Sequence, residues 1–162
     1  LIEDVSTVAV QGGIGVAVTG YATSSRRSGD ARVHGFETAS GRLLWSQSVP
    51  WLDRQLSDGG SIRGPALISG DTVVLCVRKV SSSRRVTSLY VVGLDLCTGE
   101  MKWLRLIGSV GMLAYQQSSR ATDAAIVERG IVYRTDSLGV MCALEATSGR
   151  VAWVKRLTPP PW

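Results

Sequence analysis

Three carboxylates recur in one setting along the chain and are the first candidates for acid–base chemistry. Glu37, Asp95 and Glu145 each stand four residues before a glycine, and a Ser or Thr directly precedes that glycine. A positioned carboxylate can act as a general acid or base. Repetition of the whole setting favours a structural role instead, because carboxylate and hydroxyl oxygens also accept hydrogen bonds from free backbone N–H groups in turns.

The setting belongs to a longer repeat that ends in tryptophan. Its copies read GFETASGRLLW, GLDLCTGEMKW and ALEATSGRVAW, and their glycines and tryptophans are Gly41 and Trp45, Gly99 and Trp103, and Gly149 and Trp153. The glycines lie 58 and 50 residues apart. A period near fifty with strand-like text between copies predicts an array of blades instead of one conventional core.

Each copy requires a hairpin to position these residues. A Ser/Thr-Gly pair between two apolar runs predicts a tight turn, and the tryptophan then falls on a fixed face of the returning strand. Upstream, residues 8–18, 67–77 and 126–136 each show two short strands around a glycine-containing turn. Four strands per unit are the make-up of a propeller blade, so the predicted fold class is an all-β propeller.

These units resemble the PQQ-type β-propeller repeat, with the motif A-x-D-x-x-T-G-x-x-x-W, found in quinoprotein dehydrogenases and in the lipoprotein of the outer-membrane β-barrel assembly machinery. The predicted blades are 5–49, 62–107 and 124–157, followed by a Pro-rich tail at 158–162. The first and third copies carry Glu for Asp and Ser for Thr, which preserves the acceptor chemistry. The resemblance implies that each tryptophan docks against the glycine turn of a neighbouring blade.

Three blades are too few for a closed ring, which needs about four to eight. The chain starts at Leu1 and ends in Pro-Pro-Pro-Trp. We expect a piece of a propeller of about six to eight blades, completed by the rest of a longer chain or by self-association. Open end faces should expose apolar residues near Val16 and Val132, and Trp103 in the middle blade should be the most buried tryptophan.

Other catalytic or metal-binding patterns are weak. His34 is the only histidine, and Gly12-Gly13-Ile14-Gly15 is interpreted as a strand-to-strand turn instead of a phosphate-binding loop. The cysteines, Cys76, Cys97 and Cys142, lack zinc-site spacing and are interpreted as small apolar fillers. A bridge between Cys76 and Cys97 remains the alternative.

The net charge of +5 comes mostly from arginine, which supplies 15 of the 18 basic residues. Two loops between the second and third strands of a blade carry matching Ser/Arg runs, which include Arg26, Arg27, Arg84 and Arg85. These residues should share a rim with the long connections 46–64 and 104–123. They form a hypothetical binding rim for another protein or an anionic ligand, and solvated loops are the alternative. The chain contains no recognised nucleic-acid-binding module and no predicted transmembrane segment.

The resemblance implies two functions of different classes. The first is a non-catalytic scaffold that binds a protein or ligand, located in the periplasm or exported. The second is a fragment of a PQQ-dependent alcohol or sugar dehydrogenase, with PQQ and calcium as cofactors. In that family calcium is held by a carboxylate and an asparagine, and some members carry two adjacent cysteines, but this chain has no asparagine and no such pair. The sequence therefore favours the non-enzymatic scaffold and identifies no catalytic, cofactor or metal residue.

Overall fold

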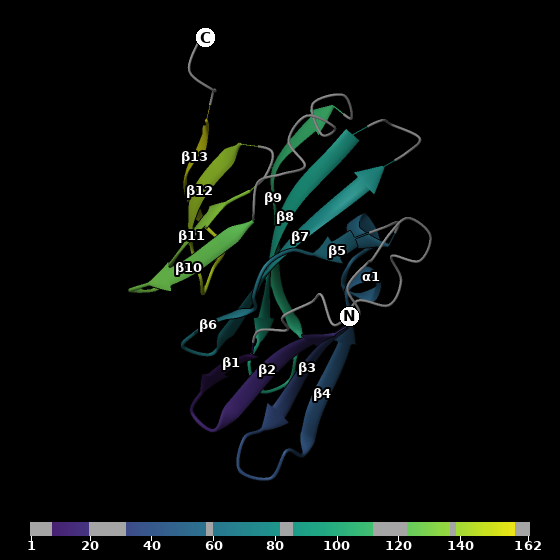
Figure 1. The fold of residues 1–162 in the computed structure, drawn as a ribbon, viewed down its shortest axis with the longest axis vertical. Coiled ribbons are helices and arrows are strands. Elements are labelled where there is room, and N and C mark those ends of the chain that lie inside the picture. The colour runs from purple at the N-terminus through teal and green to yellow at the C-terminus, as the bar shows by residue number, and fades with distance from the viewer. Residues whose placement is uncertain are drawn as a thin grey trace, which may run out of the picture.

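The computed structural model describes residues 8–19, 32–57, 60–81, 86–111, 123–136 and 139–157, which form three antiparallel sheets (Figure 1). The first sheet contains β1 (Val8–Gln11), β2 (Ile14–Thr19), β3 (Arg32–Glu37) and β4 (Leu43–Ser48) in this order. The third sheet contains β10 (Ala124–Glu128), β11 (Ile131–Thr135), β12 (Val140–Glu145) and β13 (Val151–Arg156). Both sheets have the four-strand meander that the repeat predicts.

The second sheet has one strand more than the sequence predicts. It contains β5 (Gly60–Ile62), β6 (Leu67–Ser69), β7 (Thr72–Ser81), β8 (Val86–Asp95) and β9 (Met101–Gly111). Both β5 and β6 pair with β7. The first strand is divided because Gly64 takes a left-handed φ of 79° and Pro65 has no N–H to donate to the ladder.

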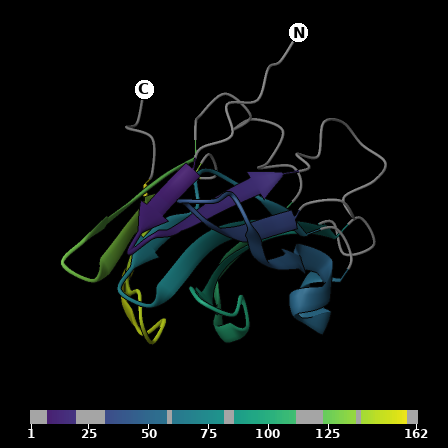
Figure 2. The ribbon, with the colours of Figure 1, turned by 90° about the horizontal axis from the view of Figure 1, so that it is seen from below.

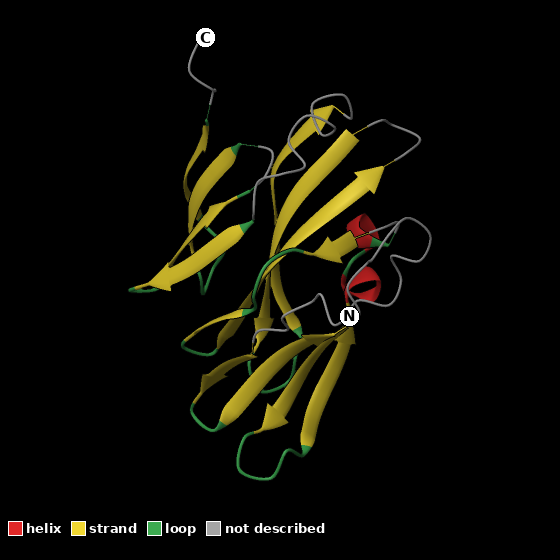
Figure 3. Cartoon of the chain, in the orientation of Figure 1, coloured by secondary structure: helices red, strands yellow, loops and turns green. Residues whose placement is uncertain are grey.

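Helical structure is confined to one connection in the part of the chain that the structure describes. It comprises α1 (Val49–Leu52) and the 3-10 helix η1 (Arg54–Leu56), which follow the first sheet (Figure 3). Val49 and Leu56 are fully buried and fix this connection against the apolar core shared by the first two sheets. No helix among the described residues is long and apolar enough to cross a membrane. The predicted all-β class is confirmed.

The three sheets follow one another in chain order (Figure 2). Two separate apolar cores lie between them. The first core joins Val16 and Trp45 of the first sheet to Leu75 of the second. The second core joins Trp103 of the second sheet to Leu144 of the third. The innermost strand β6 contacts both β1 and β10, so the first strands of the sheets converge. This convergence is the radial arrangement of propeller blades.

The prediction that Val16 and Val132 lie on the uncovered end faces is wrong. Both side chains are fully buried, because the alternation of each strand directs them toward the second sheet. The opposite faces are the open ones. Val10 of the first sheet is 61% exposed and Ile126 of the third is 62% exposed. The two end faces of the array are apolar as predicted, but the residues that form them point away from Val16 and Val132, to the opposite side of each sheet.

A tryptophan joins each sheet to the next. Trp45 Nε1 donates to the Leu96 carbonyl oxygen at 2.9 Å, and Trp103 Nε1 donates to the Ala146 carbonyl oxygen at 3.1 Å. Each accepting carbonyl directly follows the repeat carboxylate of the next copy. The indole therefore reaches the turn of the following sheet and binds its backbone.

Glycine makes this approach possible on both sides of the indole. A Cβ placed on Gly149 of the receiving turn would lie 2.5 Å from Trp103 Cδ2. A Cβ placed on Gly93, beside Trp103 in its own sheet, would lie 2.2 Å from Cε2. Gly99 and Gly35 have the same relation to Trp45. The ring is thus packed between two stretches of bare backbone.

Burial of the tryptophans depends on whether another sheet follows. Trp103 is 6% exposed and Trp45 is 8% exposed, so the predicted preference for the middle sheet is slight. Trp153, which has no described sheet beyond it, is only half-buried. The following sheet, instead of neighbours on both sides, determines the burial of each indole.

Substitution of Gly149 by alanine should destabilise the fold more than substitution of Gly130. Both glycines have positive φ, at 66° and 78°, but only Gly149 faces an indole, whereas no described atom lies within 4 Å of a Cβ on Gly130. The backbone alone should cost about 1–2 kcal/mol at either site. The clash with Trp103 should add to this cost at Gly149. Chemical denaturation of both variants measures the difference.

A double-mutant cycle isolates that contact. Trp103→Ala should cost about 3–5 kcal/mol, as expected for a buried aromatic side chain. In the Trp103→Ala background, Gly149→Ala should cost no more than Gly130→Ala. Equal costs of Gly149→Ala with and without the indole would show that the docking contact does not stabilise the fold.

Candidate functional site

The repeat carboxylates are bound within their own turns. Asp95 accepts hydrogen bonds from the backbone N–H groups of Cys97 and Thr98, both at 2.9 Å, and from the Thr98 hydroxyl at 3.2 Å. Glu145 accepts one from the Ser148 hydroxyl at 2.9 Å and is paired with Arg150. These bonds hold the turn in shape, and they engage Oδ1 of Asp95 and both carboxylate oxygens of Glu145.

The third carboxylate follows the same plan and is ionised like the others. Glu37 accepts a hydrogen bond from the Ser40 hydroxyl and lies 3.5 Å from Arg42 Nη2. The hydrogen bond from Ser40 and the charge of Arg42 lower the pKa of Glu37 below its ordinary value. Backbone hydrogen bonds lower the pKa of Asp95, and Arg150 lowers that of Glu145. A general acid near neutral pH would require a raised pKa, so these groups are suited to turn capping.

The predicted arginine rim, Arg26, Arg27, Arg84 and Arg85, lies outside the described residues. The strands that flank part of this rim are described, because Arg84 and Arg85 belong to the connection between β7 and β8. These two strands have 10 residues each and β9 has 11, against 6 in β2, β3 and β4. The middle sheet therefore projects beyond its neighbours at the end that carries this connection (Figure 1).

The helical connection contacts this projecting end of the second sheet. Lys79 Nζ of β7 donates to the Gln55 carbonyl oxygen of η1 at 2.7 Å. Arg54, also in η1, is exposed, and Arg63 is half-buried. The side chain of Trp51 and the residues Tyr115 and Arg120, which could join the rim, lie outside what the structure describes.

A buried polar cluster lies between the second and third sheets and was not predicted. Arg78 Nη2 contacts Asp123 Oδ1 and Oδ2 at 3.0 and 3.1 Å, with the two side chains only 5% and 11% exposed. Arg134 Nη1 donates to the Tyr90 carbonyl oxygen at 3.2 Å. The sequence contained one signal for this cluster. Arg134 stands at the strand position that the apolar residues Ala17 and Leu75 occupy in the first and second sheets.

The cysteines are free thiols in the structure. Cys76 and Cys142 are buried between the second and third sheets, and Cys97 is exposed in the turn after β8, so no Cys76–Cys97 bridge exists. Burial raises the pKa of Cys76 and raises that of Cys142 to about 11. Both buried thiols therefore stay protonated and fit the predicted role of apolar fillers.

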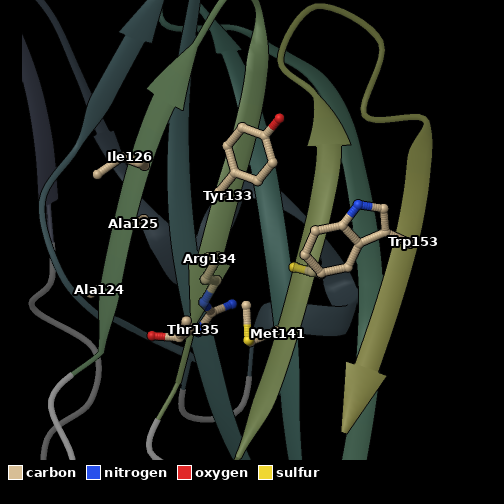
Figure 4. Close-up of a pocket in the computed structure, with 9 residues that line it drawn as sticks. Ala124, Ala125, Ile126, Tyr133, Arg134, Thr135, Met141 and Trp153 are labelled. Atoms are coloured by element: carbon tan, nitrogen blue, oxygen red, sulfur yellow. The ribbon is translucent and has the colours of Figure 1, made fainter. Parts of the chain in front are cut away.

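A shallow apolar pocket of about 220 Å³ lies on the third sheet. Tyr133 and Trp153 face each other across it, with ring centroids 6.4 Å apart and planes inclined at 48° (Figure 4). The rest of the lining is mostly apolar and comprises Ala124, Ala125, Ile126, Met141 and Cys142, with Arg134 and Thr135. The pocket faces away from the rest of the molecule and is suited to apolar side chains.

Neither the histidine nor the acidic residues form a described catalytic or metal-binding group. His34 Nε2 lies 2.9 Å from the Thr19 hydroxyl on the neighbouring strand. Gly12 and Gly13 form the two-residue turn between β1 and β2, both with positive φ. In the described parts of the chain no group of three or more His, Cys, Asp or Glu residues could hold a metal ion.

Comparison with known proteins defines the class first: the chain is a segment of a PQQ-like β-propeller. A family model described as outer membrane protein assembly factor BamB matches residues 4–155, and the chain belongs to this family. A search of the curated proteins found no match.

Solved structures share the fold. BamB from Moraxella catarrhalis aligns with a TM-score of 0.58 and 23% identity, over 96% of this chain and 38% of BamB. Quinohemoprotein alcohol dehydrogenase from Comamonas testosteroni aligns with a TM-score of 0.62 and 15% identity, over 94% of this chain and 27% of the enzyme. Quinohemoprotein alcohol dehydrogenase ADHIIG from Pseudomonas putida HK5 aligns with a TM-score of 0.60 and 18% identity, over 94% of this chain and 26% of the enzyme. The chain therefore spans less than two fifths of each of these proteins.

The lowered carboxylate pKa values predict acid-sensitive stability. A carboxyl whose pKa is lower in the folded state stabilises the fold above its unfolded pKa, which is 4.5 for Glu37 and Glu145 and 3.8 for Asp95. Stability should be constant near neutrality and fall as the pH decreases below about 4.5. Urea denaturation from pH 7 to pH 2 measures this, and Asp95→Asn should flatten the acidic limb. An unchanged slope in that variant would contradict the assignment.

The buried ion pair predicts a large cost when one partner is removed. Asp123→Asn should destabilise the protein by about 3–5 kcal/mol, because it removes a carboxylate charge that lies against the buried guanidinium of Arg78. The control is Asp71→Asn, which removes the exposed pair of Asp71 with Lys102 and should have a much smaller effect. Equal decreases in thermal stability for the two variants would show that packing between the second and third sheets does not depend on this ion pair.

Proposed function

We propose that this chain is a non-catalytic propeller segment that binds a protein on its projecting, arginine-rich end. The observation that carries the proposal is the use of all three repeat carboxylates in their own turns. Glu37, Asp95 and Glu145 are held by neighbouring hydroxyl, amide or guanidinium groups and have lowered pKa values. The recurring acidic residues thus support the fold, and binding is left to the connections.

The family supports a role in assembly. Its model is described as an outer membrane protein assembly factor, so the partner that we propose is a protein component of such an assembly. A periplasmic or exported location follows from the same reasoning. Arg26, Arg27, Arg84 and Arg85 would supply planar paired donors for the carboxylates of this partner.

The projecting second sheet gives the proposed surface a rigid base. The buried Leu89 and Val77 lie in the long strands β8 and β7, which lead to the connection with Arg84 and Arg85. A rigid strand pair restricts the positions that its connection can take, which lowers the entropy cost of binding.

The alternative is a fragment of a PQQ-dependent dehydrogenase, favoured by a fold likeness to quinohemoprotein alcohol dehydrogenases as strong as that to BamB. These identities are below 25%, so the likeness concerns the fold alone. We propose that this segment holds neither PQQ nor calcium, because it lacks asparagine and adjacent cysteines.

The test reverses the four arginines to glutamate. Cross-linking in cells followed by affinity purification should recover a protein partner with the native chain and lose it with the variant. Recovery should also decrease as salt rises, because exposed charges are screened beyond about 10 Å at 0.1 M ionic strength. Circular dichroism should be unchanged, since the repeat turns do not use these residues.

A control reverses Arg129, whose exposed side chain lies on the turn between β10 and β11, at the opposite end of the strands. This control should retain the partner. Retention of the partner by the four-arginine variant would reject the rim. Reduction of an electron-acceptor dye with an alcohol or sugar, after addition of PQQ and calcium, would favour the dehydrogenase instead.

A further inference from the structure

The buried polar cluster between the second and third sheets contains donors that no described atom satisfies. Arg134 is 3% exposed, and its Nε and Nη2 have no hydrogen-bond partner in the part of the chain that the structure describes. Its Nη1 donates to the Tyr90 carbonyl oxygen at 3.2 Å, so the group is anchored by one nitrogen only. Buried polar groups of folded proteins are nearly always paired, so two adjacent unpaired donors indicate a ligand.

The geometry of the guanidinium group specifies the kind of ligand. Nε and Nη2 lie on one edge of the planar group, and their N–H bonds point to the same side. This edge matches two oxygens of a carboxylate or phosphate group and binds them bidentately. A single carbonyl or hydroxyl oxygen would meet only one of the two donors with good geometry.

Two further buried atoms that face the third sheet also lack a described partner. Thr87 Oγ1 is fully buried, and the alternation of β8 places it on the same face as Val91, which belongs to the second core. Arg63 is half-buried, but its Nε is buried and makes no described hydrogen bond. Its backbone N–H donates to the Cys76 carbonyl oxygen at 2.8 Å. Since Ile62 faces the first core, Arg63 is directed to the opposite side.

The charges near these atoms favour an anion. The cluster includes three arginines and two aspartates, namely Arg63, Arg78, Arg134, Asp123 and Asp136. Asp123 accepts from Arg78 Nη2, and Asp136 Oδ1 accepts from the Val140 N–H at 3.2 Å. Burial raises the pKa of Cys76, and the charges of Arg134 and both aspartates also act on it, so these groups lie near this thiol. A water molecule in the cluster would leave the positive charge in excess, whereas an anion would balance it.

We propose that the Nε and Nη2 edge of Arg134 binds a small oxyanion, a phosphate or carboxylate ion, enclosed between the second and third sheets. Because Arg134 is almost fully buried, the ligand is a free ion and not a side chain of a docked partner. The Thr87 hydroxyl and Arg63 Nε are the further donors that face this interface. An ion held by Arg134 on β11 and Thr87 on β8 joins the two sheets and stabilises their junction. The site is independent of the proposed binding rim.

The first test is the dependence of thermal stability on the anion. The native protein is refolded in Tris chloride, and phosphate or acetate then replaces chloride at constant ionic strength. The midpoint of unfolding should rise by several degrees, and the rise should saturate with concentration, as for binding to the folded state alone. A rise in phosphate alone identifies a tetrahedral ion, and a rise in acetate alone identifies a carboxylate. Equal midpoints in all three salts would overturn the proposal.

Substitutions distinguish this site from a general salt effect. Arg134→Lys keeps the positive charge but removes the paired donors, so the anion-dependent rise should disappear. The matched control is Arg129→Lys, which changes an exposed arginine of the same sheet and should keep the full rise. Thr87→Val removes only the hydroxyl and should increase the anion concentration at half-saturation about tenfold, as expected for a hydrogen bond to a charged group. The same rise in the native protein and in Arg134→Lys would overturn the proposal.

Crystals of the native protein locate the ion without any substitution. If phosphate raises the midpoint, a soak in selenate should give a selenium anomalous peak within hydrogen-bond distance of Arg134 Nε and Nη2. If only acetate raises it, a soak in acetate should give planar density at the same two atoms. A single water there in the soaked crystals, or an anion only at exposed arginines such as Arg129, would overturn the proposal.

Discussion

The structure depends on one contact: an indole packed between glycine backbone of its own sheet and the glycine turn of the next. An aromatic ring of this size can approach a backbone so closely only where no Cβ intervenes, as at Gly93 and Gly149 around Trp103. The hydrogen bond from Nε1 to the Ala146 carbonyl oxygen satisfies the polar edge of a buried ring. One residue therefore supplies apolar packing and a directional bond at each junction.

This constraint explains why the repeat is visible in the sequence and why it reveals little about function. The turn must present a carbonyl and a left-handed glycine to the preceding indole, so a carboxylate and a hydroxyl hold it in that shape. Asp95 with Thr98 and Glu145 with Ser148 achieve this with different bond sets. Most of the recurring polar chemistry is thus used for folding, and functional variation is left to connections, junctions and ends.

The two junctions differ although the same contact organises them. The first is apolar and includes the helical connection through Val49 and Leu56. The second adds the buried pair of Arg78 and Asp123, which carries a desolvation cost that apolar packing would not. Such a pair requires a specific partner across the junction, which would favour the correct neighbour over another blade of the same repeat.

Much of the fold was predictable from short-range patterns. The Ser/Thr-Gly pairs, the tryptophans four residues later and the alternating apolar runs predicted three antiparallel sheets, and the structure contains them. The divided first strand of the second sheet was missed, although Gly64-Pro65 was a visible signal. Turns and strands depend on neighbouring residues, which is why local sequence suffices for them.

Which face of a strand meets a neighbour could not be derived in this way. In the register Val10 pairs with Gly15 and Ala9 pairs with Val16, so Val10 and Val16 lie on opposite faces of the first sheet. The same pattern fits a sheet packed on either side. Only the direction in which the blades follow one another buries Val16 and Val132 and exposes Val10 and Ile126. The sequence thus determined the repeated hairpin and its docking residues, whereas long-range packing decided the buried ion pair, the pocket beside Trp153 and the faces left open, because these depend on residues that meet only after the sheets have stacked.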